Sequence, residues 1–308
     1  MKIVLPRGSR SDTALSDPIL RRLQEDDRFE VYPYELPCQN YPLACTLFRD
    51  FIQRLNPDLV LCVGDRVEMA AAAATAFSLN IAVAHVYAGV TQTPFTLDDV
   101  HRHAITLYAA VHFCESVHAA TAVCKIRDAC DLPAHGVHVV GITHFDDIDL
   151  ENLDTFKVPT VPYDLVLYNA TTNLDADRRT KFAARDILTI LRLNKASGNQ
   201  MVVIGPNPDD PDLDYRLLIK NALVHYPTLP RLQFLALLKY CTNFISNSSA
   251  VVYEAPVLMT ATDQIIHPIG LRNAYRPRGP FELGASDKIV QILGEYVHAA
   301  QFRLEKKK

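Results

Sequence analysis

Short apolar runs rich in β-branched residues alternate along this chain with longer stretches of helical periodicity. In the first half, the runs are Lys2–Leu5, Asp58–Val63 and Ile81–Val86, and the stretches are Ala14–Gln24, Leu47–Leu55 and Val67–Ser78. The runs lack the apolar–polar alternation of a half-exposed strand, which indicates strands buried on both faces. Buried strands that alternate with helices predict an α/β fold with a doubly wound parallel sheet.

The alternation is interrupted once and then resumes. It continues through Ala110–Cys114, Ala119–Cys130 and Val137–Gly141, and it restarts with Leu165–Tyr168, Arg178–Leu193, Met201–Ile204, Tyr215–Ala222, Leu232–Lys239, Phe244–Ser246 and Ser286–Phe302. Between Asp146 and Pro162 the sequence is acidic, carries two prolines and has no period, which is typical of a linker. We therefore expect a Rossmann-like domain over 1–150, a linker over 151–163, a second Rossmann-like domain over 164–285, and a C-terminal helix and tail over 286–308.

Composition excludes several classes of protein. Apolar residues make up 49% and charged residues 21%, which is enough for a core and excludes a disordered chain. A net charge of −4 argues against attachment to nucleic acid or to an anionic membrane by bulk charge, and no apolar run is long enough to span a bilayer. Seven cysteines without a Cys-x-x-Cys pair, and an N-terminus without the apolar core of a signal peptide, predict reduced thiols and a cytoplasmic location.

Polar clusters follow the first two predicted strands, where doubly wound sheets bind ligands. In Gly8–Asp12 the turn before a helix offers backbone N–H groups to a phosphate, and Arg10 could add a charged fork; the alternative is a plain turn. In Gly64–Glu68 the carboxylate of Asp65 could face a ligand. The alternative for Asp65 is an N-cap with Glu68 as its capping-box partner.

A third cluster combines His85–Gly89 with the acids and bases of Asp98–His103. Carboxylates beside Arg and His could serve as general acid and base, whereas the alternative is favourable charge at a helix N-terminus. The spacing of His101 and His103 lacks a third ligand, so we expect no metal.

The fourth cluster is Ser246–Ser249, followed by Glu254. Hydroxyls at a strand-to-helix turn could bind phosphate, and a carboxylate on the next helix could accept both hydroxyls of a ribose. A serine at a helix N-cap is the commoner alternative.

Taken in order, these clusters resemble the UDP-N-acetylglucosamine 2-epimerases, in particular the hydrolysing branch that releases N-acetylmannosamine. The resemblance runs from Lys2 to about Leu293, and it is carried by Gly8–Asp12, Pro57–Gly89, Asp98–Phe113, Gly141–Ile148, Gly205–Asp210, Leu232–Pro256 and Ile269–Arg276. It implies the GT-B fold, with two Rossmann-like domains, UDP held mainly by the C-terminal one and the sugar or acceptor by the N-terminal one. It implies no cofactor.

The resemblance also implies roles for single residues. The nucleotide and its diphosphate would be bound by Arg10, Asn247, Ser248, Ser249, Glu254, Arg272 and Arg276, with Glu254 on the uridine ribose. Tyr87 does not match the family residue, but its hydroxyl or ring face could bind the sugar. Asp65 and Asp98 match two catalytic carboxylates of the family. The family's reaction removes the proton at C2 and expels UDP to give a glycal, to which water or UDP then adds.

Two departures from the family pattern leave the reaction open. The family's glutamate in the third cluster is replaced, because Tyr87 stands at one of its two locations and Val90 at the other, and the loop Tyr168–Asn173 lacks the family's histidine. One hypothesis is an epimerase or hydrolase that uses Asp65, Asp98 and His103 or Tyr87. The others are a GT-B glycosyltransferase acting on a glycan, lipid or nucleobase, and an inactive UDP-sugar binder. We favour the epimerase because the resemblance is long, and a homodimer remains open.

Overall fold

The computed structural model describes residues 1–8, 10–37, 40–91, 97–133, 136–169, 176–205, 214–259, 264–266 and 281–296, without the side chains at 10–12, 97, 176–180, 182 and 264–266. The chain divides into two compact units. Unit 1 comprises Met1–Thr91, Thr96–Asp147 and Phe281–Lys308, and unit 2 comprises Gln92–Phe95 and Ile148–Pro280. Unit 1 is therefore discontinuous in sequence, because the chain returns to it after completing unit 2.

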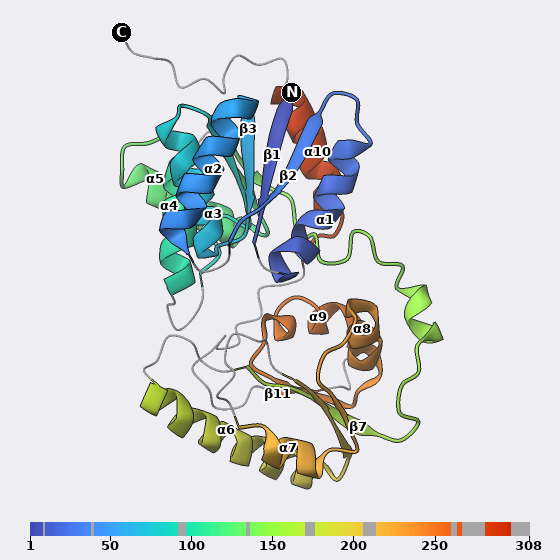
Figure 1. Cartoon of the computed structure of the whole chain (residues 1–308). Coiled ribbons are helices and arrows are strands. Elements are labelled where there is room, and N and C mark those ends of the chain that lie inside the picture. Colours follow the sequence, from blue (N-terminus) through green and yellow to red (C-terminus); the bar gives the residue numbers. More distant parts are fainter. Residues whose placement is uncertain are drawn as a thin grey trace. The chain divides into compact units, whose positions relative to one another are not determined.

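Unit 1 is built on a six-stranded sheet in which every neighbouring pair is parallel. The strands, in spatial order, are β2 (Glu30–Glu35), β1 (Lys2–Arg7), β3 (Leu59–Val63), β4 (Ala82–Val86), β5 (Val111–Cys114) and β6 (Val137–Val139). The helices are α1 (Arg10–Gln24), α2 (Tyr41–Leu55), α3 (Val67–Ser78), α4 (Leu97–Tyr108), α5 (Val117–Asp128) and α10 (Ala285–Tyr296). Figure 1 shows these helices on both sides of the sheet.

Two layers of helices bury the sheet of unit 1, as the unalternating apolar strands predict. A core cluster joins β1, β3 and β4 to α2, α3 and α4, with Val60, Phe48 and Ile52 among its fully buried members. The alanine-rich α3 packs closely on the sheet because its side chains are small. Helix α1 contacts β1, β2 and β3 and lies side by side with α10 (Figure 1).

Unit 2 repeats the same layered plan. Its parallel strands, in spatial order, are β11 (Gln264–Ile266), β10 (Asn243–Ser246), β7 (Tyr163–Leu167), β8 (Gln200–Ile204) and β9 (Val224–Tyr226). Its helices are α6 (Ala176–Ser197), α7 (Arg216–Asn221), α8 (Arg231–Tyr240), α9 (Ala255–Leu258) and the 3-10 helix η2 (Ser249–Val251). Leu165 packs with α8 and α9, whereas its neighbour Val166 packs with α6 and α7. The predicted α/β class with buried parallel strands is thereby confirmed.

The segment between the two sheets has local structure of its own. It contains the 3-10 helix η1 (Glu151–Thr155), which packs against α8. The carboxylate of Asp154 accepts a hydrogen bond from Lys239 Nζ at 2.5 Å and another from the hydroxyl of Tyr240. Part of the segment that composition indicates as a linker is thus fixed to unit 2.

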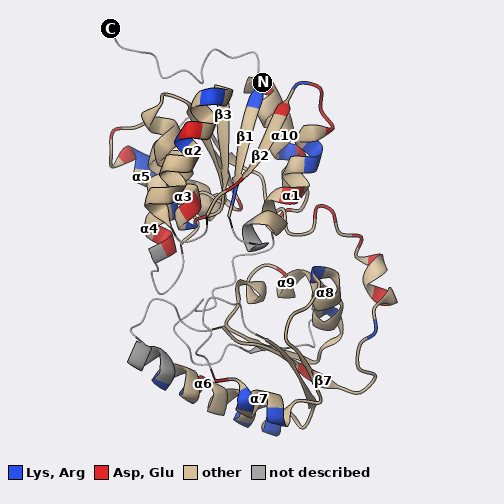
Figure 2. Ribbon diagram, viewed as in Figure 1, with Lys and Arg blue, Asp and Glu red and all other residues tan. Residues whose placement is uncertain are grey.

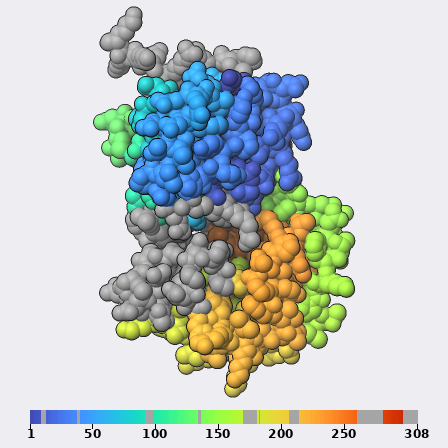
Figure 3. Space-filling view, viewed as in Figure 1, coloured from blue at the N-terminus to red at the C-terminus, as the bar shows by residue number. Residues whose placement is uncertain are grey.

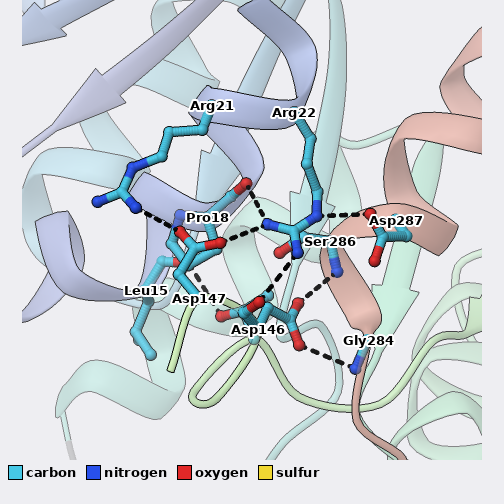
Figure 4. A network of polar contacts seen from close by, with 10 residues as sticks. Leu15, Pro18, Arg21, Arg22, Asp146, Asp147, Gly284, Ser286 and Asp287 are labelled. Atoms are coloured by element: carbon cyan, nitrogen blue, oxygen red, sulfur yellow. Dashed lines mark hydrogen bonds and ion pairs between the residues drawn. The ribbon is translucent and has the colours of Figure 1, made fainter. Parts of the chain in front are cut away.

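A polar network in unit 1 joins the residues where the chain leaves and re-enters that unit (Figure 4). Asp146 accepts hydrogen bonds from the backbone N–H groups of Gly284 at 2.8 Å and Ser286 at 2.7 Å, so it satisfies donors at the N-terminus of α10. Arg22 of α1 donates to Asp147 at 2.7 Å and to Asp287 at 2.5 Å. Exit and return are therefore held together by Asp146 at the N-terminus of α10 and by Arg22 between Asp147 and Asp287.

Charged residues of both signs are scattered over the helices of unit 1 (Figure 2), in keeping with the small net charge. On the face seen in Figure 3, the first half of unit 1 forms a continuous surface coloured in shades of blue. Within the described part of the chain, no helix is both long enough and apolar enough to cross a bilayer.

Candidate active site and nucleotide site

Asp65 lies at the switch point of the sheet in unit 1, where β1 and β3 are neighbours and the helices that follow them lie on opposite faces. Gly64 turns the chain with a φ of 90°, and Asp65 follows it. Helix α3 has Arg66 at its N-cap, so the alternative of Asp65 as an N-cap is not what the structure shows. The carboxylate of Asp65 instead pairs with the guanidinium of Arg102 from α4.

Arg102 is held firmly because it is buried and its Nη1 donates to the backbone oxygen of Val90 at 2.7 Å. Since Val90 belongs to the turn after β4, the guanidinium joins the ends of two neighbouring strands to α4. Val90 is one of the two locations at which the family pattern has a glutamate. In this chain the side chain that faces Asp65 is Arg102, which donates to the backbone of that turn. The turn itself provides no carboxylate at Val90.

Asp98 lies in the first turn of α4, one turn before Arg102. Its side chain keeps contact with solvent, but the protein around the carboxyl desolvates it in part. This desolvation and the nearby charge of Asp65 raise the pKa of Asp98 above its usual value, so the carboxyl holds a proton more readily than a free aspartate. The two predicted catalytic carboxylates are thus close enough to influence each other.

His103 lies on the same helix and is half-buried. Burial lowers its pKa, so its imidazole is neutral near pH 7. Its Nδ1 is buried and finds no hydrogen-bond partner among the described residues. In that part of the chain, no group of three or more His, Cys, Asp and Glu side chains could hold a metal ion, His101 and His103 included.

Tyr87 is buried at the end of β4, with a φ of 64° that is rare for a residue other than glycine. Its hydroxyl accepts a hydrogen bond from Thr143 N at 2.9 Å and lies 3.0 Å from both Thr143 Oγ1 and His144 Nδ1. Burial raises the pKa of the phenol, so Tyr87 stays protonated and cannot act as the base that a glutamate would supply. Its predicted contact with substrate remains a prediction.

Sequence reasoning did not select Glu115, which is buried directly after β5. The charge of Glu115 also contributes to the raised pKa of Tyr87, so the carboxylate lies near that phenol. The signal that could have found it is the one that selected Asp65, namely an acid immediately after a two-sided apolar strand.

The sheet of unit 2 has its switch point between β7 and β10, and two asparagines join the strand ends there. Asn247 Oδ1 accepts from Asn169 N at 2.8 Å, and Asn247 Nδ2 donates to Asn169 O at 2.7 Å. Ser246 adds a bond to Leu167 O at 2.6 Å. These bonds fix the turn that leads from β10 into η2.

Ser248 and Ser249 follow this turn. The hydroxyl of Ser248 accepts from Ala250 N at 3.3 Å, so it is the N-cap of η2, which is the commoner role that sequence analysis weighed for these serines. Ser249 is the first residue of that short helix. Backbone N–H groups at a capped turn are nevertheless suited to bind phosphate oxygens.

Glu254 is buried at the start of α9, and its carboxylate pairs with Arg231 Nη2 at 3.2 Å. Arg231 is the first residue of α8, so the pair joins two helices on the same face of the sheet. The side chains of Arg10, Arg272 and Arg276, and the loop after Asn169, lie outside the described residues. Their predicted roles remain predictions.

A family model described as UDP-N-acetylglucosamine 2-epimerase matches residues 39–265, which span both units and every described residue of the candidate site. The chain belongs to this family. The predicted resemblance is therefore confirmed.

Two curated relatives are also named as 2-epimerases of nucleotide sugars. One is the UDP-N-acetylglucosamine 2-epimerase of Neisseria meningitidis serogroup B, which is 26% identical over 244 residues, or 74% of this chain and 62% of that protein. The other is the GDP/UDP-N,N'-diacetylbacillosamine 2-epimerase (hydrolyzing) of Campylobacter jejuni, which is 23% identical over 79% of this chain and 63% of that protein. The matched part of the chain thus spans less than two thirds of the length of either relative.

Solved structures of the family confirm the GT-B fold. The UDP-GlcNAc 2-epimerase from Neisseria meningitidis bound to UDP-GlcNAc matches with a TM-score of 0.72 at 15% identity, covering 98% of this chain and 93% of that one. The Methanocaldococcus jannaschii enzyme in complex with UDP-GlcNAc and UDP matches with a TM-score of 0.73 at 16% identity, covering 96% and 100%.

Proposed function

We propose that this chain is a UDP-sugar-processing enzyme, a UDP-N-acetylglucosamine 2-epimerase of the hydrolysing type. The observation that carries the proposal is the arrangement around Arg102, which pairs with Asp65 one helical turn from Asp98 on α4. One carboxylate is thereby held beside a guanidinium, while the pKa of the other is raised by desolvation and by its neighbour. Two carboxyl groups in different environments suit a reaction that takes a proton from one atom and returns it.

In this proposal, unit 2 binds UDP and unit 1 acts on the sugar. Glu254 accepts the ribose hydroxyls, and the turn held by Asn247 presents Ser248 and Ser249 to the diphosphate. Asp98 takes the proton from C2 as the C1–O bond to UDP breaks, and UDP leaves with the electron pair to give a glycal. The guanidinium of Arg102, paired with Asp65, stabilises the negative charge that develops on the leaving diphosphate. Water then adds its hydroxyl to C1, and a proton is delivered to the opposite face of C2. The predicted cations Arg10, Arg272 and Arg276 would bind the phosphates.

The alternative is a GT-B glycosyltransferase, and the state of Tyr87 favours it. A protonated, buried phenol replaces a family glutamate, which removes a base from the epimerase chemistry. Proton transfer by a positioned side chain contributes about 10²–10⁴-fold in rate. A transferase needs the nucleotide site and one base for its acceptor, which Asp65 or Asp98 could supply.

Incubation with a panel of UDP-sugars, with and without glycan, lipid and nucleobase acceptors, separates the two functions by NMR of the products. Free N-acetylmannosamine supports the hydrolysing epimerase, whereas turnover only with an acceptor supports the transferase. Asp98→Asn should abolish turnover and leave UDP affinity within about threefold. No turnover of any UDP-sugar by the native protein would refute both.

A binding experiment tests the nucleotide site by itself. Glu254→Ala should weaken UDP binding at least about tenfold, because hydrogen bonds to a charged group contribute about 1.5–3 kcal/mol each. The matched control is Asp154→Ala, which removes an exposed carboxylate of the same unit. Equal UDP affinities of the two variants in calorimetry would refute the role of Glu254.

A further inference from the structure

His85 is a fully buried histidine in β4 that no part of the proposed reaction uses. Burial lowers its pKa to about 3, so the imidazole is neutral at physiological pH. A neutral imidazole has one N–H donor and one acceptor nitrogen, and the neighbours of each nitrogen decide which is which. Both ring nitrogens of His85 have polar neighbours.

The first neighbour is the turn that carries Asp65. His85 Nε2 lies 2.9 Å from the backbone oxygen of Gly64, and a carbonyl oxygen only accepts, so the proton is on Nε2. This oxygen belongs to the peptide group that joins Gly64 to Asp65. A bond to it fixes the plane of that peptide. Gly64 has no Cβ to restrict its backbone, and it adopts a φ of 90° here, so this bond limits a turn that would otherwise be free to change conformation.

The second neighbour belongs to the helix that carries Arg102. With the proton on Nε2, His85 Nδ1 is an acceptor, and Thr106 Oγ1 lies 3.3 Å from it. The hydroxyl has a single proton, and the backbone oxygen of Arg102, 3.0 Å away and one turn earlier on α4, is the other acceptor in reach of it. Thr106 is a fully buried residue of α4, so a hydrogen bond from its hydroxyl to Nδ1 joins the imidazole directly to that helix.

We propose that His85 is a positioning residue that holds Asp65 and Arg102 in register, with one ring nitrogen on the turn before Asp65 and the other on the helix of Arg102. The inference rests on the proposed function in that Asp65 takes part in the reaction. The structural claim is independent of that function, because it concerns only what fixes the ion pair of Asp65 and Arg102. A reacting group displaced by about 1 Å can lose about a hundredfold in rate, so a residue behind the ion pair can matter to the reaction.

A second buried histidine provides a matched control. His112 lies in β5 directly opposite His85 in the sheet register, and its Nε2 is 2.9 Å from the backbone oxygen of Thr106. Burial lowers its pKa to about 4, so it is also neutral. Within the described part of the chain, its hydrogen bonds go to Thr106 and Gly136 and not to Gly64 or Asp65. Its loss therefore removes a buried imidazole that also contacts Thr106 of α4, so the two variants differ in the bond to the turn of Gly64.

The experiment compares His85→Leu, His85→Gln and His112→Leu. His85→Leu should lower kcat about a hundredfold with UDP affinity unchanged, since the UDP site is assigned to unit 2. His85→Gln should recover at least about tenfold of that loss, because its amide N–H can reach the oxygen of Gly64 as Nε2 does. His112→Leu should lower the melting temperature but leave kcat within about threefold.

Three results would overturn the inference: an unchanged kcat in His85→Leu, equal losses of kcat in both leucine variants, or no recovery in His85→Gln. If the native protein turns over no UDP-sugar, the Nε–H signal of Arg102 in ¹⁵N NMR decides instead. His85→Leu should shift or broaden this signal, and His112→Leu should not. An unmoved signal refutes the positioning role, whereas a moved signal without turnover refutes only the proposed function.

Discussion

The carboxylate of Asp164 offers the sharpest test of what stabilises unit 2. It is fully buried at the start of β7 and accepts four hydrogen bonds from neutral side chains. Asn194 Nδ2 at 2.8 Å and Ser197 Oγ at 2.6 Å donate to Oδ2, and Asn199 Nδ2 at 2.8 Å and Asn243 Nδ2 at 2.7 Å donate to Oδ1. The four donors come from α6, the turn after it and β10, so one side chain joins three segments.

Asp164→Asn replaces one of the two oxygens by an NH₂ group, which then faces donors. If the NH₂ group takes the place of Oδ2, it faces Asn194 and Ser197. Ser197 can adapt, because its hydroxyl has a second acceptor in Asn194 O at 2.8 Å and can rotate toward it. The amide N–H of Asn194 cannot, so at least one buried donor loses its acceptor, and the remaining bonds lose their charge. Hydrogen bonds to a charged group contribute about 1.5–3 kcal/mol each, so we expect a loss of about 3 kcal/mol. Typical domains have only about 5–15 kcal/mol in total.

The assay is urea denaturation followed by circular dichroism, with hydrogen exchange of β7 and β10 to place the loss in unit 2. The control is Asp214→Asn in the same unit, where an exposed carboxylate pairs with Arg216 at 2.7 Å. The control should be indistinguishable from the native protein, because exposed ion pairs contribute little. The reasoning fails if Asp164→Asn is as stable as the native protein, or if the control loses as much.

Two further predictions concern stability in unit 1. Gly89→Ala should lower the melting temperature well below that of the control Gly198→Ala. The two glycines have similar φ values, 74° and 71°, but a Cβ at Gly89 would collide with the backbone oxygen of Ala119, whereas a Cβ at Gly198 would meet open space. Equal losses of melting temperature in the two variants would contradict this. Because burial lowers the native pKa values of His85 and His112 to about 3 and about 4, their stabilising contribution is complete above pH 6.5 and falls as the pH drops below it. Each should cost up to about 1.4 kcal/mol per pH unit there, and an unchanged acid slope of urea denaturation in His112→Gln would count against this.

The central strands could be predicted from the sequence because they are buried on both faces and read as continuous apolar runs. Strand β2 was not predicted, since its sequence EVYPYE leaves residues partly or fully exposed at the edge of the sheet and contains Pro33. Strands β9 and β11 have only three residues each and give no periodic signal. The packing of α10 on α1 was not predicted either, because an amphipathic pattern does not specify which partner covers it.

The candidate site was also predictable from the sequence only in part. Asp65 and Glu254 could be selected because they stand close after predicted strands, and the resemblance gave them roles. Their partners Arg102 and Arg231 could not be assigned, since each pair forms only when separate elements of the fold meet. For Tyr87, the residue type alone predicted a poor base. Its hydrogen bonds to Thr143 and His144 could be found only from the structure, because these residues are far from it in sequence.

The return of the chain to unit 1 also affects how the protein is made. A ribosome finishes Asp147 before it makes any of α10, and the intervening residues take on the order of ten seconds at typical rates of synthesis. Throughout that time the face of α1 that α10 later covers is open, and Arg22 lacks Asp287. The nascent first unit therefore stays incomplete until the ribosome has made all of unit 2 and then α10. A chain released early at about residue 280 would be a natural substrate for chaperones and proteases.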